Sequence, residues 1–566
     1  MIFSFSTNNR GSKFLDIEFI IENNKDSEIY VQLPAWRPGR YELANFAKNI
    51  QKFDVRTLNN KVLKFEKVSK DKWKIYAGKL NKLKIKYNYY ANELNAGSTW
   101  VDENQTYINP VNCCLYVEGR EDEPIKLVFN KLNHKQTATS LKKNGDYYIA
   151  KSYDELADSP FIISNSLKYN SFNVKGVKFN LWFQGECRPP WKKIIKDFKA
   201  FTKAQLNVFG SFPFEEYNFM YQILPYKAYH GVEHLKSTVI SFGPGYSVFE
   251  DENYEEFLGV SSHELFHAWN VKTIRPSELL PYDFTKENYT RMGYLTEGLT
   301  TYYGDLMLKR SKVFTTEQFI KQINKTLDRH FFNYGNQNLS IADSSFDTWL
   351  DGYVRGIPNR KGSIYIEGSI MAMIIDLKIR AKSNGEKSLD NVLRNLFDKK
   401  GKKGQGITND YFKSTIEKAA GTSLEILWEN LFYGKNQYFN ILKESLSPFG
   451  IKIKKHMNTD LLAAKYGFFS HSGTSKAMFI APNSPSHKAG LNVNDEIIAV
   501  NEIEVKKDNA NKWVKYFGEK VQLTIKKDDL IRNIELSPSS KSFFPKVRLI
   551  LPSGKSNKLY KNWLGE

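Results

Sequence analysis

The sequence predicts a multidomain α+β protein in which a mostly helical region lies between two β regions. Its 566 residues exceed what one hydrophobic core usually holds. Short apolar runs separated by turn residues fill the first 170 residues and return after about residue 447, whereas helical spacing dominates from about 252 to 435. We therefore expect three domains and a C-terminal tail, at residues 1–170, 171–446, 447–540 and 541–566.

The first region carries the pattern of an antiparallel β domain. Apolar and polar residues alternate with period two at residues 14–20, 29–33 and 83–89. The loop at residues 34–41 is rich in turn-forming residues and holds no recognisable chemistry. We expect this domain to act as a scaffold or as one wall of a cleft.

The charge and cysteine content exclude some functional classes. The net charge is +20, but lysine is spread along the whole chain, and the one tight basic run, at residues 399–404, has the composition of a solvated loop. We therefore expect no nucleic-acid partner. Three cysteines, Cys113, Cys114 and Cys187, provide neither a zinc knuckle nor a disulfide framework.

Two further observations concern location. Residues 1–6 lack both the basic and the apolar segments of a signal peptide. No window of 18 uncharged apolar residues occurs, so the sequence predicts no membrane span. The expectation is a cytoplasmic protein with no membrane partner.

The middle region begins with strands at about 179–183 and 217–224, separated by a helix at about 191–208. Helices then dominate, and the first long one carries the run Ser262-His263-Glu264-Leu265-Phe266-His267. Further helices are predicted at about 295–312, 315–330 and 367–382. Strands followed by helices with a metal motif on the first are typical of the catalytic domain of a zinc peptidase.

The H-E-x-x-H run is the main chemical signal. Residues four apart share a helix face, so His263 and His267 can bind one metal ion. Glu264 can then accept a proton from a water molecule at that ion. The alternative is a helix with two surface histidines. Histidine is scarce in this chain, nine residues in 566, which favours the metal interpretation.

A catalytic zinc site takes three protein ligands and keeps one position open. Glu297, 30 residues after His267, is the best third ligand, because a loop and a return helix fit in that interval. Gly298 after it would permit close helix approach. The alternative is a carboxylate that satisfies a helix N-terminus. Glu278 and Glu287 lie in the connecting segment and are expected to be solvated. One Zn²⁺ per chain is therefore predicted.

Residues 261–306, SSHELFHAWNVKTIRPSELLPYDFTKENYTRMGYLTEGLTTYYGDL, resemble the glycyl aminopeptidase family of gluzincin zinc metallopeptidases. The resemblance extends over nearly the whole chain, including LPAWRPGRYELANFAKNI in the β domain and ADSPFIISN at its end. Its most specific part is the zinc motif with its WNVKTIRP continuation. It implies a thermolysin-like, mostly helical catalytic domain.

The same resemblance implies roles for residues outside the zinc motif. Glu233, in His230-Gly231-Val232-Glu233-His234, takes the position of the glutamate that holds the substrate's free α-amino group, and Gly231 and Val232 line that subsite. Val232 and His234 replace the Met and Asn of the aminopeptidase N form.

Tyr365 matches the tyrosine that stabilises the oxyanion in the wider group, although Ile364 and Glu367 depart from the family pattern around it. Its rivals for this role are Tyr302, Tyr303 and Tyr353.

The region at 447–540 resembles a PDZ domain. It contains a Gly467-Phe468-Phe469 turn, which would offer backbone N–H groups to a carboxylate, and the run SPSHKAGLNVNDEIIAVN at residues 484–501. PDZ domains bind extended peptides by strand addition, so the groove is a candidate site for a peptide ligand. The alternative is a small β domain that serves as a structural cap.

The leading functional hypothesis is a zinc-dependent aminopeptidase. It would remove Gly- or Ala-like residues from peptides with a free N-terminus, using a zinc-activated water with Glu264 as general base. Two alternatives stay open. One is a zinc endopeptidase whose PDZ-like domain presents substrates, and the other is a peptide-binding adaptor with a vestigial catalytic site.

Overall fold

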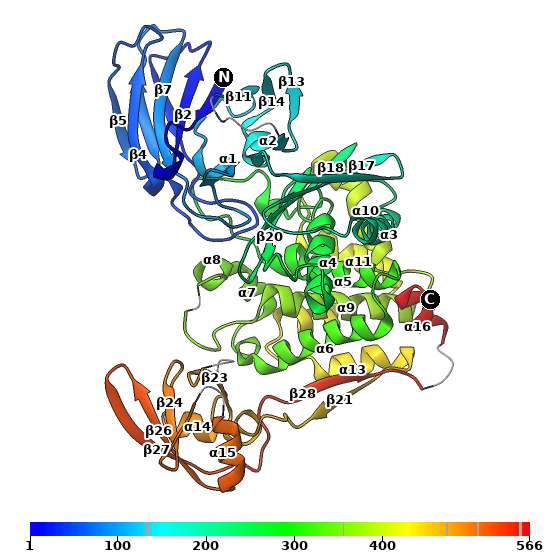
Figure 1. Cartoon of the computed structure of the whole chain (residues 1–566). Helices are drawn as coiled ribbons and strands as arrows, with labels where there is room; N and C mark the ends of the chain where they lie inside the picture. Colours follow the sequence, from blue (N-terminus) through cyan, green and yellow to red (C-terminus); the bar gives the residue numbers. More distant parts are fainter. Residues whose placement is uncertain (131, 133–135, 355, 471–473, 507–508, 554–556) are drawn as a thin grey trace.

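A computed structural model of the chain describes residues 1–566 except 131, 133–135, 355, 471–473, 507–508 and 554–556. Figure 1 shows a β-rich N-terminal region at the top in blue and cyan, a helical middle in green and yellow, and a small β-rich region at the bottom in orange. The predicted multidomain α+β organisation, with N-terminal β sheets followed by helices, is confirmed.

The N-terminal region consists of three sheets. Their strand orders are β13-β14-β11-β1-β2-β7-β4, β10-β3-β6-β5 and β12-β15-β9-β8. Every ladder in them is antiparallel except the pairing of β1 with β11. The elements are β1 Ile2–Ser6, β2 Phe14–Ile21, β3 Glu28–Gln32, β4 Ile50–Arg56, β5 Phe65–Ser69, β6 Lys72–Tyr76, β7 Leu83–Tyr90, β8 Trp100–Val101, β9 Gln105–Ile108, α1 Pro110–Cys113, β10 Tyr116–Val117, β11 Ile125–Phe129, β12 Gln136–Ala138, β13 Lys142–Asn144, β14 Tyr147–Ala150, α2 Tyr153–Ala157 and β15 Phe161–Ser164.

Alternating side chains explain why these residues form sheets around one core. In β2 every second residue is buried, so one face of the strand enters the core and the other faces outward. Phe3 on β1 and Phe19 on β2 stack with their ring centroids 4.2 Å apart. Trp73 on β6, from the second sheet, belongs to the same apolar cluster. The two larger sheets therefore share one hydrophobic core.

A five-stranded sheet with the order β16-β17-β18-β20-β19 opens the middle region, which the sequence predicts to be catalytic and which is called the catalytic region below. β17, β18 and β20 run parallel, whereas β19 is antiparallel to β20 and forms one edge. The helix α3 connects β17 to β18 and packs on the sheet. The bounds are β16 Lys168–Val174, β17 Val177–Gln184, α3 Trp191–Phe209, β18 Glu216–Ile223, β19 Ala228–Glu233 and β20 Ser237–Gly243.

Helices make up most of the remaining catalytic region. α9 is apolar on nearly every side and contacts α5, α6, α11 and α13, so it forms the centre of the helical layer. The helices are α4 Asp251–Phe266, α5 Leu299–Arg310, α6 Thr316–Phe332, α7 Ile341–Phe346, α8 Thr348–Asp351, α9 Ile364–Lys382, α10 Leu389–Lys399, α11 Asn409–Ala420, α12 Glu425–Trp428 and α13 Phe439–Leu446. No helix of the described residues is both long and apolar enough to cross a membrane.

The C-terminal region has an apolar core of its own, built around a sheet of order β25-β24-β26-β27. Phe468 and Phe469, predicted to form a turn with Gly467, instead lie in the strand β22, which follows Gly467 and pairs with β23. The strand β21 Lys452–His456 precedes this region, and its Ile453 belongs to the core of the helical region. The elements of the C-terminal region are β22 Phe468–Ser470, β23 Ala477–Ile480, α14 Pro485–Lys488, β24 Glu496–Val500, β25 Ile503–Glu504, α15 Ala510–Phe517, β26 Val521–Lys527 and β27 Leu530–Leu536.

Residues 541–566, expected as a tail, return to the catalytic region. The strand β28 Lys546–Ile550 pairs with β21, and the helix α16 Lys558–Leu564 packs on α5 and α9. Trp563 is fully buried and donates its indole N–H to the Tyr302 hydroxyl at 2.8 Å. Arg380 also donates to the Asn562 carbonyl at 3.0 Å. The chain end therefore forms a clasp on the catalytic core.

Replacing Trp563 by alanine should destabilise the catalytic region by about 3–5 kcal/mol, because the change leaves a large cavity and removes the hydrogen bond that the buried Tyr302 hydroxyl accepts. Guanidinium denaturation followed by circular dichroism would measure the shift. Lys561→Ala, an exposed position on the same helix, is the control. An unchanged midpoint for Trp563→Ala would contradict the clasp.

Candidate active site

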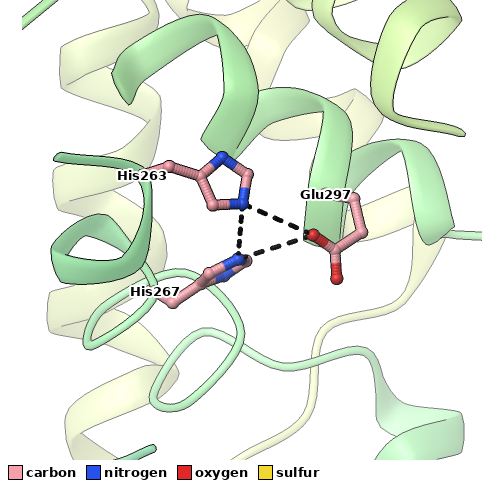
Figure 2. Close-up of side chains that lie close together, drawn as sticks. All are labelled: His263, His267 and Glu297. Atoms are coloured by element: carbon pink, nitrogen blue, oxygen red, sulfur yellow. Dashed lines mark hydrogen bonds and ion pairs between the residues drawn. The ribbon is translucent and has the colours of Figure 1, made fainter. Parts of the chain in front are cut away.

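The residues predicted to bind metal lie together in the helical layer. Figure 2 shows the two imidazoles of His263 and His267 and the Glu297 carboxylate turned toward one point. The two Nε2 atoms are 3.0 Å apart, and Glu297 Oε2 lies 3.7 Å from His263 Nε2 and 3.4 Å from His267 Nε2. His267 and Glu297 are buried, whereas 18% of the His263 side chain remains exposed. Solvent therefore reaches the trio from the His263 side.

The chain immediately after α4 orients His267. The helix ends at Phe266, and the His267 Nδ1 atom lies 2.8 Å from the Asn270 carbonyl oxygen. This contact assigns the proton to Nδ1 and leaves the Nε2 lone pair for a ligand. The Asn270 side chain in turn donates to the Leu295 carbonyl at 2.7 Å and to Thr300 at 2.9 Å. One asparagine thus links the loop after the motif helix to the segment that carries Glu297.

Glu297 lies in a π-helical turn, Tyr294–Gly298, that leads directly into α5. The following Gly298 permits very close approach of α9, because a Cβ there would lie 2.3 Å from the Gly368 Cα. Such π turns are frequent at functional sites. The close approach expected from Gly298 in the sequence is present, and it fixes the depth at which Glu297 enters the site.

The donor set fits a divalent metal. Two imidazole nitrogens and one carboxylate oxygen, with all ligand atoms within 4.8 Å of one another, match a hydrolytic zinc site with an open fourth position. Burial opposes the ionisation of both groups, yet Glu297 raises the pKa of His267 to about 10 and the imidazoles lower that of Glu297 to about 2. The same attraction of the carboxylate for positive charge would favour a bound cation.

Glu264 also lies close to His267 and is buried. Gly231 on β19 packs directly on its carboxylate, since a Cβ at that position would lie 2.1 Å from Glu264 Oε1. The Thr238 hydroxyl lies 3.4 Å from Glu264 Oε2. Burial raises the pKa of Glu264 to about 8, with the charges of Glu233 and Glu297 adding to the effect and His267 opposing it. The carboxyl is thereby suited to hold a proton.

Glu233 ends the edge strand β19 and joins this group. Ligand atoms of Glu233, Glu264 and His267 lie within 4.8 Å of one another. Val232, predicted to line the same subsite, is fully buried in the cluster between the sheet and the N-terminal region. The structure thus brings Gly231 to Glu264 and Glu233 to His267, whereas the Val232 side chain packs away from them.

A buried ionic cluster explains how His234 supports Glu233. Asp158, at the end of α2, accepts hydrogen bonds from His234 Nδ1 at 3.0 Å, from the Leu235 N–H at 2.8 Å and from Lys272 at 2.9 Å. Although burial opposes it, Lys272 and His234 hold the pKa of Asp158 well below its usual range. The cluster ties the N-terminal region, the end of β19 and the chain after the zinc motif to one another. His234 therefore has a positioning contact of its own.

Tyr365, near the start of α9, lies beside Glu297 and Tyr353. Burial raises its pKa well above the ordinary value, and the charge of Glu297 and the Tyr353 hydroxyl act in the same direction, so the phenol stays a proton donor. Two rivals are engaged elsewhere, because Tyr302 donates to Asp376 and Tyr303 to Asp390 in the helical core. Tyr353 lies beside Tyr365, so these two phenols are the candidates at the site.

The loop at residues 34–41 contributes to the site. The sequence did not predict this contribution. Gly39, with φ +81°, packs on the Glu233 carboxylate, and a Cβ there would lie 2.4 Å from Glu233 Oε2. Tyr353 donates to the Gly39 carbonyl at 3.4 Å. One feature of the sequence could have indicated it: Arg, Pro and Gly are concentrated between Trp36 and Tyr41. Both of these large side chains are buried.

Comparison with known proteins agrees with this geometry. The sequence model of the peptidase M61 N-terminal domain matches residues 3–165, and that of the M61 glycyl aminopeptidases matches residues 256–371. A crystal structure of an aminopeptidase N family protein from Idiomarina loihiensis is 25% identical, with a TM-score of 0.92 over 100% of this chain and 99% of that one. No curated protein matches in sequence.

More distant structures are also similar. One is an M1 zinc metallopeptidase from Deinococcus radiodurans, 12% identical, with a TM-score of 0.44 over 77% of this chain and 93% of that chain. Another is leukotriene A4 hydrolase from Saccharomyces cerevisiae, 12% identical, with a TM-score of 0.45 over 76% of this chain and 67% of that chain.

The catalytic match and the fold define the class of this protein as a zinc metallopeptidase of the aminopeptidase type. Its N-terminal and catalytic regions each match a model of the M61 peptidases, and the resemblance seen in the sequence is confirmed.

Glu297→Gln should sharply reduce zinc content after dialysis against a weak chelator. Loss of a residue that only orients a ligand already weakens metal binding about 10–100-fold, and loss of a ligand should weaken it more. Mass spectrometry of bound metal would measure the stoichiometry, expected to be one zinc per chain in the wild type. Glu278→Gln, at an exposed position in the connecting segment, is the control. Full zinc occupancy in Glu297→Gln would exclude this residue as a ligand.

Proposed function

We propose that this enzyme removes single small residues, such as Gly or Ala, from peptides with a free N-terminus. The observation that carries the proposal is the position of Glu233. Its carboxylate lies within 4.8 Å of ligand atoms of both Glu264 and His267, and His267 is one of the three proposed metal ligands. A carboxylate at that distance can bind the α-ammonium group and fix which peptide bond is presented.

His263, His267 and Glu297 would hold one Zn²⁺. When bound, zinc polarises a carbonyl and lowers the pKa of a coordinated water toward about 7. The protein's own groups then determine how protons move. Glu264 accepts the proton of the attacking water on a carboxylate oxygen and transfers it to the leaving amine nitrogen. Thr238, at 3.4 Å, helps to orient this carboxylate.

The negative charge that develops on the substrate carbonyl needs a donor. Tyr365 is the best placed, because its phenol is held protonated beside Glu297, and Tyr353 supports it from the side. A hydrogen bond aimed at the developing oxyanion contributes more in the transition state than in the ground state. Val232 shapes the subsite through its backbone, since its side chain is buried among apolar neighbours.

The preference for a small first residue is supported by the packing around Glu233. Gly39 covers its carboxylate on one side, and Glu233 is only 5% exposed. A chain that continued on the N-terminal side of this first residue would have to displace the 34–41 loop. This arrangement favours removal of N-terminal residues over internal cleavage.

The C-terminal region is proposed to be a PDZ-like domain formed by residues 447–540. The catalytic domain before it is proposed to span residues 171–446. Its separate core and the short β22–β23 pair after Gly467 support this assignment. A peptide ligand in its groove and a cytoplasmic location stay predictions. An endopeptidase or an inactive adaptor would be revealed by the following experiment.

The zinc-loaded enzyme should release one residue from free glycyl and alanyl peptides and leave their N-acetylated forms intact, as measured by mass spectrometry. Glu264→Gln should lose at least about 100-fold in rate, because the general base is gone. Glu233→Gln should lose activity mainly through a higher KM, because the charge that binds the amine is gone.

Internal cleavage that ignores acetylation and survives Glu233→Gln would establish an endopeptidase instead. No cleavage by zinc-loaded enzyme would favour the adaptor. Glu278→Gln controls for an unspecific effect of removing a carboxylate.

A further inference from the structure

Arg37 is a buried guanidinium next to the edge strand of the catalytic sheet. It lies in the 34–41 loop of the N-terminal region and is 5% exposed. Its side chain packs against the backbone of Gly97, where a Cβ would lie 2.1 Å from the guanidinium carbon. Nη2 lies 3.5 Å from Nε2 of His230, three residues before Glu233 on β19. The only other hydrogen bond among the described residues is from Nη1 to the Pro38 carbonyl, at 3.3 Å.

The Arg37 charge has no acidic partner within 4.0 Å in the part of the chain that the structure describes. Arg40, in the same loop, by contrast pairs with Glu42 at 2.6 Å. A guanidinium offers five N–H donors, and Arg37 uses two of them in long contacts. Leaving a buried cation unpaired is costly, so such a group at a substrate site points to an anionic ligand.

The neighbours of Arg37 allow an anion to approach. His230 is uncharged, because burial lowers its pKa to about 3 and the charges of Arg37 and Arg40 add to the effect. A cavity of about 210 Å³ in the N-terminal region also reaches Arg37 and is lined by Asn95, Ser98 and Thr99.

The spacing along β19 identifies which part of a substrate reaches Arg37. A strand rises about 3.3 Å per residue, so His230 lies about 10 Å along the edge from Glu233. An extended tripeptide whose ammonium group is at Glu233 spans about the same length to its C-terminal carboxylate. Glu233 and Arg37 would then bind opposite charges at the two ends of one short peptide.

We propose that Arg37 binds the C-terminal carboxylate of short peptides, so that peptides of two or three residues are the preferred substrates. This inference rests on the proposed aminopeptidase function. Arg37 is thus a specificity-determining residue supplied by the N-terminal region, and the enzyme selects substrates by length as well as by their first residue.

The test compares kcat/KM for glycyl-alanine and glycyl-alanyl-alanine as free acids and as C-terminal amides. Wild type should prefer at least one acid over its amide by about 30-fold or more, the usual effect of removing one partner of a buried charge pair. Arg37→Gln should abolish that preference while still cleaving the amides. Arg56→Gln, which removes a guanidinium paired with Asp54 on β4 of the same region, should keep the wild-type preference.

Several outcomes would overturn the proposal. Equal rates on acids and amides in the wild type would exclude carboxylate recognition and leave the aminopeptidase function intact. A preference for glycyl-aspartyl amide over glycyl-asparaginyl amide that is lost in Arg37→Gln would assign the guanidinium to an acidic side chain instead. Failure of the wild type on every free-amine peptide would reject the proposed function itself.

Thermal melting and zinc content would identify a folding defect in Arg37→Gln. In that case Arg37→Lys, which keeps the charge but loses the two-pronged geometry, should retain part of the acid preference. A full wild-type preference in a folded Arg37→Gln would exclude Arg37 from carboxylate binding.

Discussion

The need to hold three buried carboxylates around one imidazole governs the architecture of this site. Glu233, Glu264 and Glu297 all lie near His267, and each is at most 5% exposed. Like charges at this distance repel one another strongly when water is excluded. The surrounding structure therefore has to fix each carboxylate from a different element: the edge strand for Glu233, the motif helix for Glu264 and the π turn before α5 for Glu297.

Part of this support comes from outside the catalytic region. Asp158, at the end of the N-terminal β region, binds His234, which follows the edge strand β19, and Lys272, which follows the H-E-x-x-H motif. The loop with Gly39 covers Glu233 from the same side. The two regions are thus joined by buried ionic contacts at the site, and a displacement of one would alter the geometry of the other. The N-terminal region is part of the proposed active site as well as its support.

Sequence reasoning predicted the features that depend on local spacing. The grouping of the three proposed metal ligands was predictable, because His263 and His267 are one helical turn apart and Glu297 follows in the next helical segment. The main strands and helices followed from periodicity, as for α3 and α9. The contributions of Arg37 and Asp158 were not predictable, because the catalytic-region residues that they contact lie more than 70 residues away and a single charged residue in a loop has no periodicity. The docking of α16 was missed for a similar reason. Its seven residues are too few to show a helical pattern, and Trp563 donates its hydrogen bond to Tyr302, which is far away in the sequence.

Glycine at the points of closest approach explains how so many charged groups fit in this space. Gly231 packs on Glu264, Gly39 on Glu233, and Gly298 next to Glu297 on Gly368, and a Cβ at any of these three positions would come within 2.4 Å of its neighbour. Backbone surrounds the carboxylates where side chains would otherwise hold them apart. This packing excludes water from Glu264, and the resulting desolvation raises its pKa to about 8. The same packing leaves little space around the proposed amine anchor, so the basicity of the proposed general base and the proposed preference for a small first residue have one physical origin.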